Sequence, residues 1–497
     1  MSPSVIIISI VGYFGLLLMI AWYTSRNAGN DAYFLGNKKS PWYAVAFGMI
    51  GDSLSGVTFI SLPGTVSANQ FSYMQLVLGY LLGYVIIARV LLPLYYKLNL
   101  TSIYSYLNER FGIYSQKTGS FYFLVSRIIG ASLRLFLTAG VLQFFVFDHY
   151  GVPFWLTVSI IIILILIYTY RGGIKTLVWT DTLQSGLLLL GVILSIVAIL
   201  SQLDMGISEA ISEIKNSQMS KIFFWDWHEK SFFPKQFLSG AFIAVVMTGL
   251  DQNMMQKNLS MPNLKDAQKN IYWFSIILVV VNLLFVCLGA LLYLYSYKQG
   301  IDLPLDPATG KVIGDKVFPL LALDHLGMFA AVVFIIGLTA ATFSSADSVL
   351  TTLTTSFCID FLGMDKSKDD EKKKTNTRHI VHIAFAIILL LVIILCGYLP
   401  EDISVLDLIF SIAAYTYGPL LGLFAFGLFT KMKVRDVWVP VVAGLSVIIS
   451  YALKTNSEVW FGGYKFGYEL LLFNGIFTFI GLLIISKNQL NKKNETV

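Results

Sequence analysis

The chain has 497 residues, of which 56% are apolar, 14% are aromatic and only 13% are charged. A typical soluble domain has about 25% charged residues, and no polar linker divides this chain into soluble domains. The composition therefore excludes a soluble multidomain enzyme, a disordered chain and a nucleic-acid-binding protein as its main class. The three cysteines all lie in apolar runs and predict neither a disulfide framework nor a metal site.

A helix needs about 20 mostly apolar residues to cross a membrane, and the sequence contains thirteen such runs. In chain order they cover residues 5–24, 41–62, 73–96, 121–147, 153–170, 177–202, 238–256, 271–296, 326–357, 379–399, 404–430, 437–454 and 466–486. The first run has neither a basic start nor a small-residue cleavage site, so it is predicted to be a span rather than a signal peptide. We therefore expect an all-α membrane protein with about thirteen transmembrane helices.

The distribution of Lys and Arg predicts how these spans are oriented, because positive residues favour the cytoplasmic side. One alternating set of loops holds 23 of the 35 basic residues, Lys257 among them, the other set holds nine, and three lie within spans. The N-terminus is therefore predicted to lie outside the cell (inner) membrane and the C-terminus in the cytoplasm. The net charge of +6 is explained by this topology, so neither a nucleic acid nor an obligate protein partner is indicated beside the lipid bilayer.

Two spans carry glycines and polar residues where a continuous apolar helix would be expected. The run 41–62 contains Gly48, Gly51 and Gly56, and the run 238–256 contains Thr248 and Gly249. Irregular backbone at this depth is tolerated only where it lines a cavity or is buried in protein. The two runs lie five spans apart, which is typical of inverted five-helix repeats whose broken helices meet at a site near the membrane midplane. The alternative is that small residues merely allow close helix packing.

The run 326–357 presents hydroxyl, carboxylate and backbone oxygens on one broad helical face. The residues on this face are Ala341, Ser344, Ser345, Asp347 and Ser348. Hard cations bind oxygen ligands, and a carboxylate inside a span is a functional hypothesis by default. The hydroxyls alone have a structural alternative, since Ser and Thr often bond to carbonyls of their own helix.

Other charged residues in the spans also have two interpretations. Asp181 begins the run 177–202 after a predicted inner turn at Arg171-Gly172-Gly173. With Gln184 one turn later, it is either part of a polar seam or a helix N-cap. Arg127 and Arg134 lie seven residues apart on one face of the run 121–147. Arg134 either holds a substrate carboxylate through its guanidinium fork or pairs with an internal carboxylate such as Asp52.

Several motifs resemble those of the sodium:solute symporter family, over nearly the whole chain. They are TSIYSYLNERFG (101–112), YTYRGGIKTLVWTDTLQ (168–184), DQNMMQ (251–256), SSADS (344–348) and YGPLLGLF (417–424). The bacterial branch with sialic-acid transporters is the most similar. The resemblance implies a leucine-transporter-type fold as a single transporter domain. Residues 1–40 would form an added first helix and inner loop, 41–202 and 238–430 the two repeats, and 431–497 two C-terminal helices and an inner tail.

The resemblance also implies ligand sets, carried over by position. The main Na⁺ site would consist of Gly51, Leu54, Ala341, Ser344 and Ser345. A second Na⁺ site, which only some members have, would use Asp181, Ser345 and Ser348, with Asp347 added where the family pattern has serine. Sialic-acid members hold the substrate carboxylate with an arginine near the position of Gly130, and this chain has no arginine there.

Together these observations predict a sodium-coupled secondary active symporter, with no catalytic residues, that imports a small polar solute by alternating access. The solute is expected to be a sugar, a sugar acid such as sialic acid, or a monocarboxylate. The predicted substrate-binding residues are Ser53, Ser55, Thr58, Tyr73, Arg134, Asp251 and Gln252. The alternative is a proton-coupled solute transporter in which Asp181 and Asp347 titrate. An intramembrane aspartyl protease would need Tyr-Asp and Gly-Leu-Gly-Asp elements, which the sequence lacks.

Overall fold

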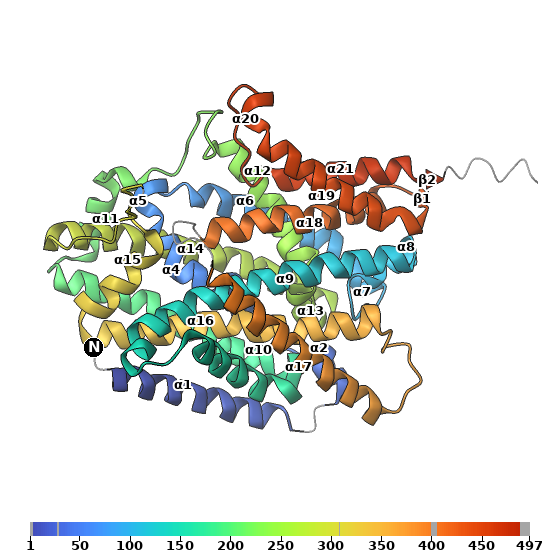
Figure 1. The fold of residues 1–497 in the computed structure, drawn as a ribbon, viewed down its shortest axis with the longest axis horizontal. Helices are drawn as coiled ribbons and strands as arrows, with labels where there is room; N and C mark the ends of the chain where they lie inside the picture. The colour runs from blue at the N-terminus through green and yellow to red at the C-terminus, as the bar shows by residue number, and fades with distance from the viewer. Residues whose placement is uncertain (1–2, 27–28, 308, 399–404, 488–497) are drawn as a thin grey trace, which may run out of the picture.

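A computed structural model describes residues 3–26, 29–307, 309–398 and 405–487 of the chain. Most helices run roughly parallel to the long axis of the molecule, with α1 along one side and α19 and α21 along the opposite side (Figure 1). The first half of the chain comprises α1 (Pro3–Thr24), α2 (Asn30–Leu35), α3 (Trp42–Ser53), α4 (Gly56–Gly64), α5 (Val66–Asn69), α6 (Tyr73–Ile86), α7 (Leu92–Lys97), α8 (Ser105–Arg110), α9 (Ile113–Leu142), α10 (Phe154–Gln202) and α11 (Ile207–Asn216).

The second half comprises α12 (Phe233–Ala244), α13 (Gln252–Leu259), α14 (Leu264–Gln299), α15 (Gly314–Leu320), α16 (Gly327–Ser356), α17 (Glu371–Cys396), α18 (Val405–Phe429), α19 (Val439–Thr455), α20 (Ser457–Trp460) and α21 (Leu470–Ile484). Short π-helical segments cover Ile87–Leu91, Gln143–Phe147, Val245–Gly249, Leu321–His325 and Phe357–Phe361. Two two-residue strands, β1 (Lys433–Val434) and β2 (Ser486–Lys487), pair antiparallel near the end of the described chain.

Each of the thirteen predicted runs coincides with helical structure. By length and composition, the described residues contain nine helices that could cross a membrane, or up to eleven if each of two bent helix pairs is one span. The other two runs correspond to the shorter apolar helices Phe154–Tyr170 and Leu470–Ile484. The protein is therefore a multi-pass helical membrane protein, while the count of thirteen crossings stays a prediction.

The two bent pairs are the two spans that the sequence predicts to be broken. Helices α3 and α4 meet at an angle of 56°, and the chain between them is non-helical at Leu54 (φ −103°, ψ 73°) and extended at Ser55. Helices α12 and α13 meet at 62°, across the π-helical segment and an extended Asp251 (φ −110°, ψ 120°). Backbone polar groups freed by such breaks must find partners or a cavity.

A third break divides α10, where Gly173 takes φ 49° and ψ −143°. A Cβ atom at this position would lie 2.5 Å from the Tyr33 carbonyl oxygen, so both the backbone conformation and the close approach of α2 require glycine. The predicted turn at Gly172-Gly173 is thus present. It separates the apolar helix 154–170 from the helix that carries Asp181.

The broken helices lie in the interior of the bundle. Helix α3 packs against α10, α14 and α16, while α4 packs against α9, α14, α16 and α18. Helix α10 packs along α16, and α13 contacts α3, α10 and α16. This arrangement brings the polar residues of α3, α9, α10, α13 and α16 to the centre of the molecule.

Candidate functional site

A cavity lies at the break between α3 and α4. Its polar lining residues are Asp52, Ser53, Ser55, Thr58, Tyr73, Tyr80, Tyr84, Arg127, Arg134, Thr248 and Asn282. Of the seven predicted substrate-binding residues, five line this cavity, and Asp251 and Gln252 are not among its lining residues in the described structure. The side chains of these five residues, which are Ser53, Ser55, Thr58, Tyr73 and Arg134, therefore face a common space.

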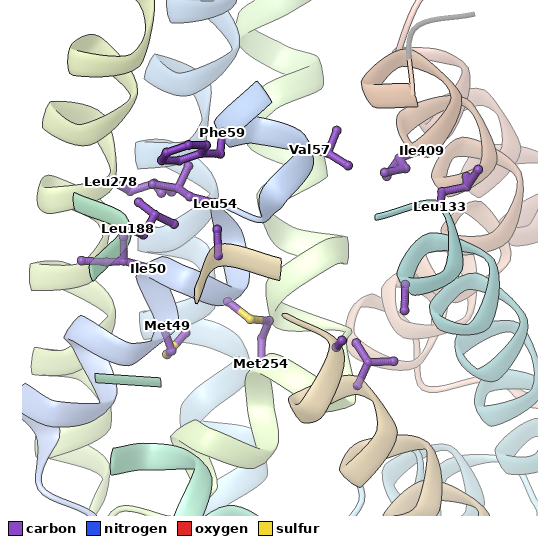
Figure 2. Close-up of a cluster of buried hydrophobic side chains, with 14 of the residues drawn as sticks. Met49, Ile50, Leu54, Val57, Phe59, Leu133, Leu188, Met254, Leu278 and Ile409 are labelled. Carbon is purple, nitrogen blue, oxygen red and sulfur yellow. The ribbon is translucent and has the colours of Figure 1, made fainter. Parts of the chain in front are cut away.

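Apolar side chains form the remaining walls of this cavity. Figure 2 shows Val57 directed toward Ile409 of α18 and Leu133 of α9, whereas Leu54 lies on the opposite side beside Leu278 of α14. Val57, Ile409, Leu54 and Leu278 are all lining residues. A pocket whose walls combine apolar side chains with convergent polar groups is typical of small-molecule sites.

The two arginines of α9 differ in their partners. The Arg127 Nε donates to Asp251 Oδ2 at 2.6 Å, so this guanidinium is neutralised within the protein. Arg134 is 9% exposed, and in the part of the chain that the structure describes no carboxylate lies within 4 Å of it and its Nε has no hydrogen-bond partner. A buried charge without a partner is costly, so Arg134 is the group of this cavity that most requires an anion.

The side chains of Asp251 and Gln252, which the sequence predicts to bind substrate, form hydrogen bonds to other parts of the protein. Asp251 accepts hydrogen bonds from Arg127, from the Tyr417 hydroxyl at 2.5 Å and from the Met254 amide at 3.2 Å, the last as the N-cap of α13. The Gln252 side chain accepts from the Ile103 amide at 2.9 Å and donates to the Thr101 carbonyl at 2.8 Å. Both side chains therefore stabilise the second half of the broken span.

Two of the predicted main Na⁺ residues, Gly51 and Ser344, face each other where the end of α3 lies against the middle of α16. A Cβ on Gly51 would lie 2.7 Å from the Ser344 Oγ, so the backbone at the break directly faces this hydroxyl. The Ser345 hydroxyl donates to the Thr342 carbonyl at 3.0 Å, which leaves its lone pairs free to act as ligands.

The backbone of α3 supplies further oxygens at this point. The last four carbonyls of a helix have no partner within the helix, and in α3 these include the carbonyls near Gly51 and Leu54. Ser185 of α10 fixes the segment, because its Oγ accepts from the Gly51 amide at 2.8 Å and donates to the Gly48 carbonyl at 3.2 Å. Carbonyl and hydroxyl oxygens from two elements are a donor set that fits a hard monovalent cation. The sequence interpretation did not identify Ser185, although it follows the WTDTLQ motif directly.

A second cluster lies beside the first and contains a residue that the sequence interpretation placed in a cytoplasmic loop. The ammonium group of Lys257 on α13 donates to Asp181 Oδ2 at 2.5 Å and also to Asp52. The Ser344 Oγ lies 3.4 Å from Asp181 Oδ1, and the Ser348 Oγ lies 3.5 Å from Asp181 Oδ2. Asp181 therefore joins both broken helices to α16.

Asp347 is the third carboxylate of this cluster. Its Oδ2 accepts from the Tyr168 hydroxyl at 2.8 Å, and it lies within electrostatic range of Asp181 and Lys257. Of the residues predicted for a second Na⁺, Ser348 approaches Asp181 and its amide donates to Asp347 Oδ1 at 2.5 Å, whereas Ser345 bonds to Thr342 and Ser344 approaches Asp181 instead. Lys257 could have been identified from its position one helical turn after Asn253 in the polar segment DQNMMQK.

Comparisons with known proteins identify the family of the chain. The sequence model of the sodium:solute symporter family matches residues 33–435. The sodium/sialic acid symporter NanT of Aliivibrio fischeri is 26% identical over 92% of this chain and 89% of its own. The mouse sodium-coupled monocarboxylate transporter 1 is 24% identical over 86% of this chain and 69% of its own.

Two solved structures have the same fold. A substrate-bound, outward-open Na⁺-coupled sialic acid symporter superposes with a TM-score of 0.80 at 23% identity, covering 97% of this chain and 98% of its own. The nucleobase-cation symporter Mhp1, in a closed conformation, superposes with a TM-score of 0.54 at 14% identity, covering 92% and 94%. The leucine-transporter-type fold is thus confirmed. The chain belongs to the sodium:solute symporter family and is a sodium-coupled secondary active symporter of a small solute rather than an enzyme.

Proposed function

We propose that this symporter imports a small carboxylate-bearing solute and that Arg134 holds the carboxylate. The observation that carries this proposal is the buried guanidinium of Arg134, which lines the cavity and has no carboxylate within 4 Å among the described residues. The hydroxyls of Ser53, Ser55 and Thr58 on the facing helix segment are suited to the remaining polar groups of the solute. The relatives named for sialic acid and for monocarboxylates have carboxylate substrates, which supports the same class.

The coupling Na⁺ is proposed to bind to Gly51, Leu54, Ala341, Ser344 and Ser345. Supporting this set, the end of α3 and the Ser344 hydroxyl approach each other directly. Leu54 also lines the solute cavity. A Na⁺ bound to its carbonyl would therefore place a positive charge beside the solute. Ser185 would hold the helix break in place, because its Oγ accepts a hydrogen bond from the Gly51 amide.

The arrangement in the membrane is part of the same proposal. Residues 41–202 and 238–430 would form two inverted repeats, and the two broken helices, one in each range, support this division. The N-terminus would face outward and the C-terminus inward, on the basis of the Lys and Arg distribution. Alternating access would then expose the cavity to the two sides in turn.

The experiment that tests the substrate class is Na⁺-driven uptake into proteoliposomes. Lactate, pyruvate, gluconate and N-acetylneuraminate would be compared with glucose and galactose. At least one carboxylate should accumulate and the neutral sugars should not compete. Arg134→Gln should weaken the apparent affinity for that carboxylate roughly 10- to 150-fold, which is the value of about 1.5–3 kcal/mol for a hydrogen bond to a charged group.

The matched control is Arg89→Gln, because Arg89 donates a 3.4 Å hydrogen bond to the Tyr272 hydroxyl and is not among the described residues that line the cavity. Its uptake should equal that of the unmodified protein. Transport of a neutral sugar that no carboxylate inhibits, or an Arg134→Gln variant with unchanged affinity, would rule out this assignment.

A further inference from the structure

The Lys257 cluster combines features that the proposed transport cycle does not explain. Lys257 is 1% exposed, and its ammonium group forms ion pairs with Asp181 and Asp52. Asp181 lies on α10, and Asp52 lies on α3, the first half of the broken span 41–62. A lysine this deeply buried is rare unless its charge is matched, and here two carboxylates match it.

The ammonium group occupies the position in which a second cation would need to bind. Asp181 is the central ligand of any such site, and its Oδ2 is the atom that Lys257 contacts at 2.5 Å. The hydroxyls of Ser344 and Ser348 lie within 3.5 Å of the two oxygens of the same carboxylate. An ammonium group and Na⁺ carry the same charge and are both stabilised by oxygen atoms, so the two would compete for this carboxylate.

We propose that the Lys257 ammonium stands in for a second coupling cation at Asp181, so that one Na⁺, not two, binds in each transport cycle. The predicted second Na⁺ site therefore does not fit this chain as it stands. The proposal rests on the proposed main Na⁺ site, whose ligand Ser344 also lies 3.4 Å from Asp181 Oδ1.

The side chain cannot easily leave this position. Lys257 belongs to α13, whose residues 252–259 are all buried. Its own carbonyl accepts from the Ser260 hydroxyl at 2.7 Å and from the Ser260 amide at 3.2 Å, which fixes the backbone at the end of the helix. Two of its three N–H donors are used by Asp181 and Asp52. A Na⁺ that approached Asp181 would meet a fixed like charge.

The test counts bound Na⁺ and needs no solute. Binding of ²²Na⁺ alone to the purified, detergent-solubilised full chain would be measured to saturation. The unmodified protein should bind one Na⁺ with a Hill coefficient of about 1. Lys257→Met retains the apolar stem but removes the charge, and it should bind one additional Na⁺ with a Hill coefficient that approaches 2.

Three variants separate this effect from misfolding and from general charge effects. Lys257→Arg keeps a cation and should retain the unmodified count. Lys269→Met removes a lysine that lies over the Trp42 ring, outside the cluster, and should also retain it. The double variant Asp52→Asn with Lys257→Met removes one carboxylate together with the ammonium, which limits the charge left unpaired, and should still gain one Na⁺.

The outcomes distinguish this proposal from the proposed main site. Two Na⁺ bound by the unmodified protein, or equal counts in the unmodified protein and both Lys257→Met variants, would overturn the stand-in role. A Ser345→Ala variant with unchanged Na⁺ affinity would instead count against the main site. The difference of one Na⁺ between the unmodified and Lys257→Met proteins remains interpretable in that case.

Discussion

Gly51 is the residue at which the proposed main Na⁺ site depends most directly on the absence of a side chain. A Cβ there would lie 2.7 Å from the Ser344 Oγ and 2.8 Å from the Ser185 Oγ. Gly51→Ala should therefore displace one proposed ligand and the hydroxyl that fixes the break, and raise the Na⁺ concentration for half-maximal binding roughly tenfold, about 1.4 kcal/mol. Na⁺-dependent thermal stabilisation of the purified protein would measure this change.

The control for this substitution is Gly130→Ala. A Cβ at Gly130 would meet no described atom within 4 Å, and Gly130 lies inside the long helix α9, where alanine is the better helix former. Its Na⁺ dependence should be unchanged and its stability equal or higher. Equal Na⁺ affinities for the two alanine variants would contradict the position assigned to the ion.

Ser345→Ala tests the opposite side of the same site. Within the described part of the chain, the Ser345 hydroxyl is bonded only to the Thr342 carbonyl of its own helix at 3.0 Å, so its removal leaves no described partner group unsatisfied in another element. Folding should be retained, while the half-maximal Na⁺ concentration should rise because one proposed ligand is lost. Na⁺ titrations of transport and of thermal stability should both report this increase, and an unchanged Na⁺ dependence would argue against Ser345 as a ligand.

Single residues were predictable from the sequence where their chemistry conflicted with a membrane span. Ser53, Ser55 and Thr58 interrupt an apolar run, and Arg134 is a charge inside one, so each signalled a cavity. Asp251 gave the same signal, but its partner Arg127 lies 124 positions away, and that pairing becomes visible only when the helices pack. Lys257 was misplaced because it follows an apolar run as a loop cation would.

At the scale of secondary-structure elements, the second broken span depends on the buried ion pair between Asp251 and Arg127. The carboxylate also accepts from the Tyr417 hydroxyl at 2.5 Å and caps α13 through the Met254 amide. Asp251→Asn retains a capping side chain but leaves Arg127 uncompensated, and breaking such a pair costs about 3–5 kcal/mol. Thermal unfolding of the variant should occur at a clearly lower temperature.

A structural role for Asp251 also predicts that its substitution leaves the Na⁺ affinity unchanged. The Na⁺ affinity of Asp251→Asn should remain close to that of the unmodified protein at temperatures where it is folded, because the proposed Na⁺ ligands are on other elements. Asp302→Asn, in an exposed loop, is the control and should leave the unfolding temperature unchanged. A variant of normal stability that no longer binds solute would restore the substrate-binding role predicted from the sequence.

Helix breaks were predictable because each requires residues that an apolar span would not contain. Glycine and polar residues at positions 48–58 and 248–251 marked both of them, and Gly172-Gly173 marked the third. The angles of 56° and 62° and the π-helical turn before Leu250 were not predictable, since they depend on how neighbouring helices pack. Helix ends also moved: α9 begins at Ile113, eight residues before the predicted apolar run, because its first turns are polar.

For the whole molecule, hydropathy and motif spacing were sufficient to predict the fold class. A membrane span must satisfy its backbone internally, so thirteen apolar runs leave few arrangements other than a helical bundle. The solute pocket is the exception, because it is assembled from α3, α4, α6, α9, α12, α13, α14, α18 and the π-helical segment Val245–Gly249, each of which contributes one to three residues. No single segment of sequence therefore contains the information that defines the substrate.

The two proposals together determine how the membrane potential acts on the whole transport cycle. One Na⁺ that moves with one monocarboxylate anion transfers no net charge. A tenfold Na⁺ gradient then supports about tenfold accumulation, whatever the potential. With two Na⁺ per anion, one net charge would cross, and a potential of 100 mV would add about 2.3 kcal/mol, which together with the second Na⁺ gives roughly 5,000-fold accumulation.

This difference can be measured in proteoliposomes in which a K⁺ gradient and valinomycin set the potential. Uptake of the carboxylate selected by the Arg134 experiment should reach the same final level at 0 and at −100 mV, inside negative, and choline in place of Na⁺ should abolish accumulation. Lys257→Met, which is expected to bind a second Na⁺, should accumulate more solute at −100 mV than at 0 mV. A strong dependence on potential in the unmodified protein would show that more positive charge enters than one Na⁺ carries, and undiminished uptake in choline would favour proton coupling instead.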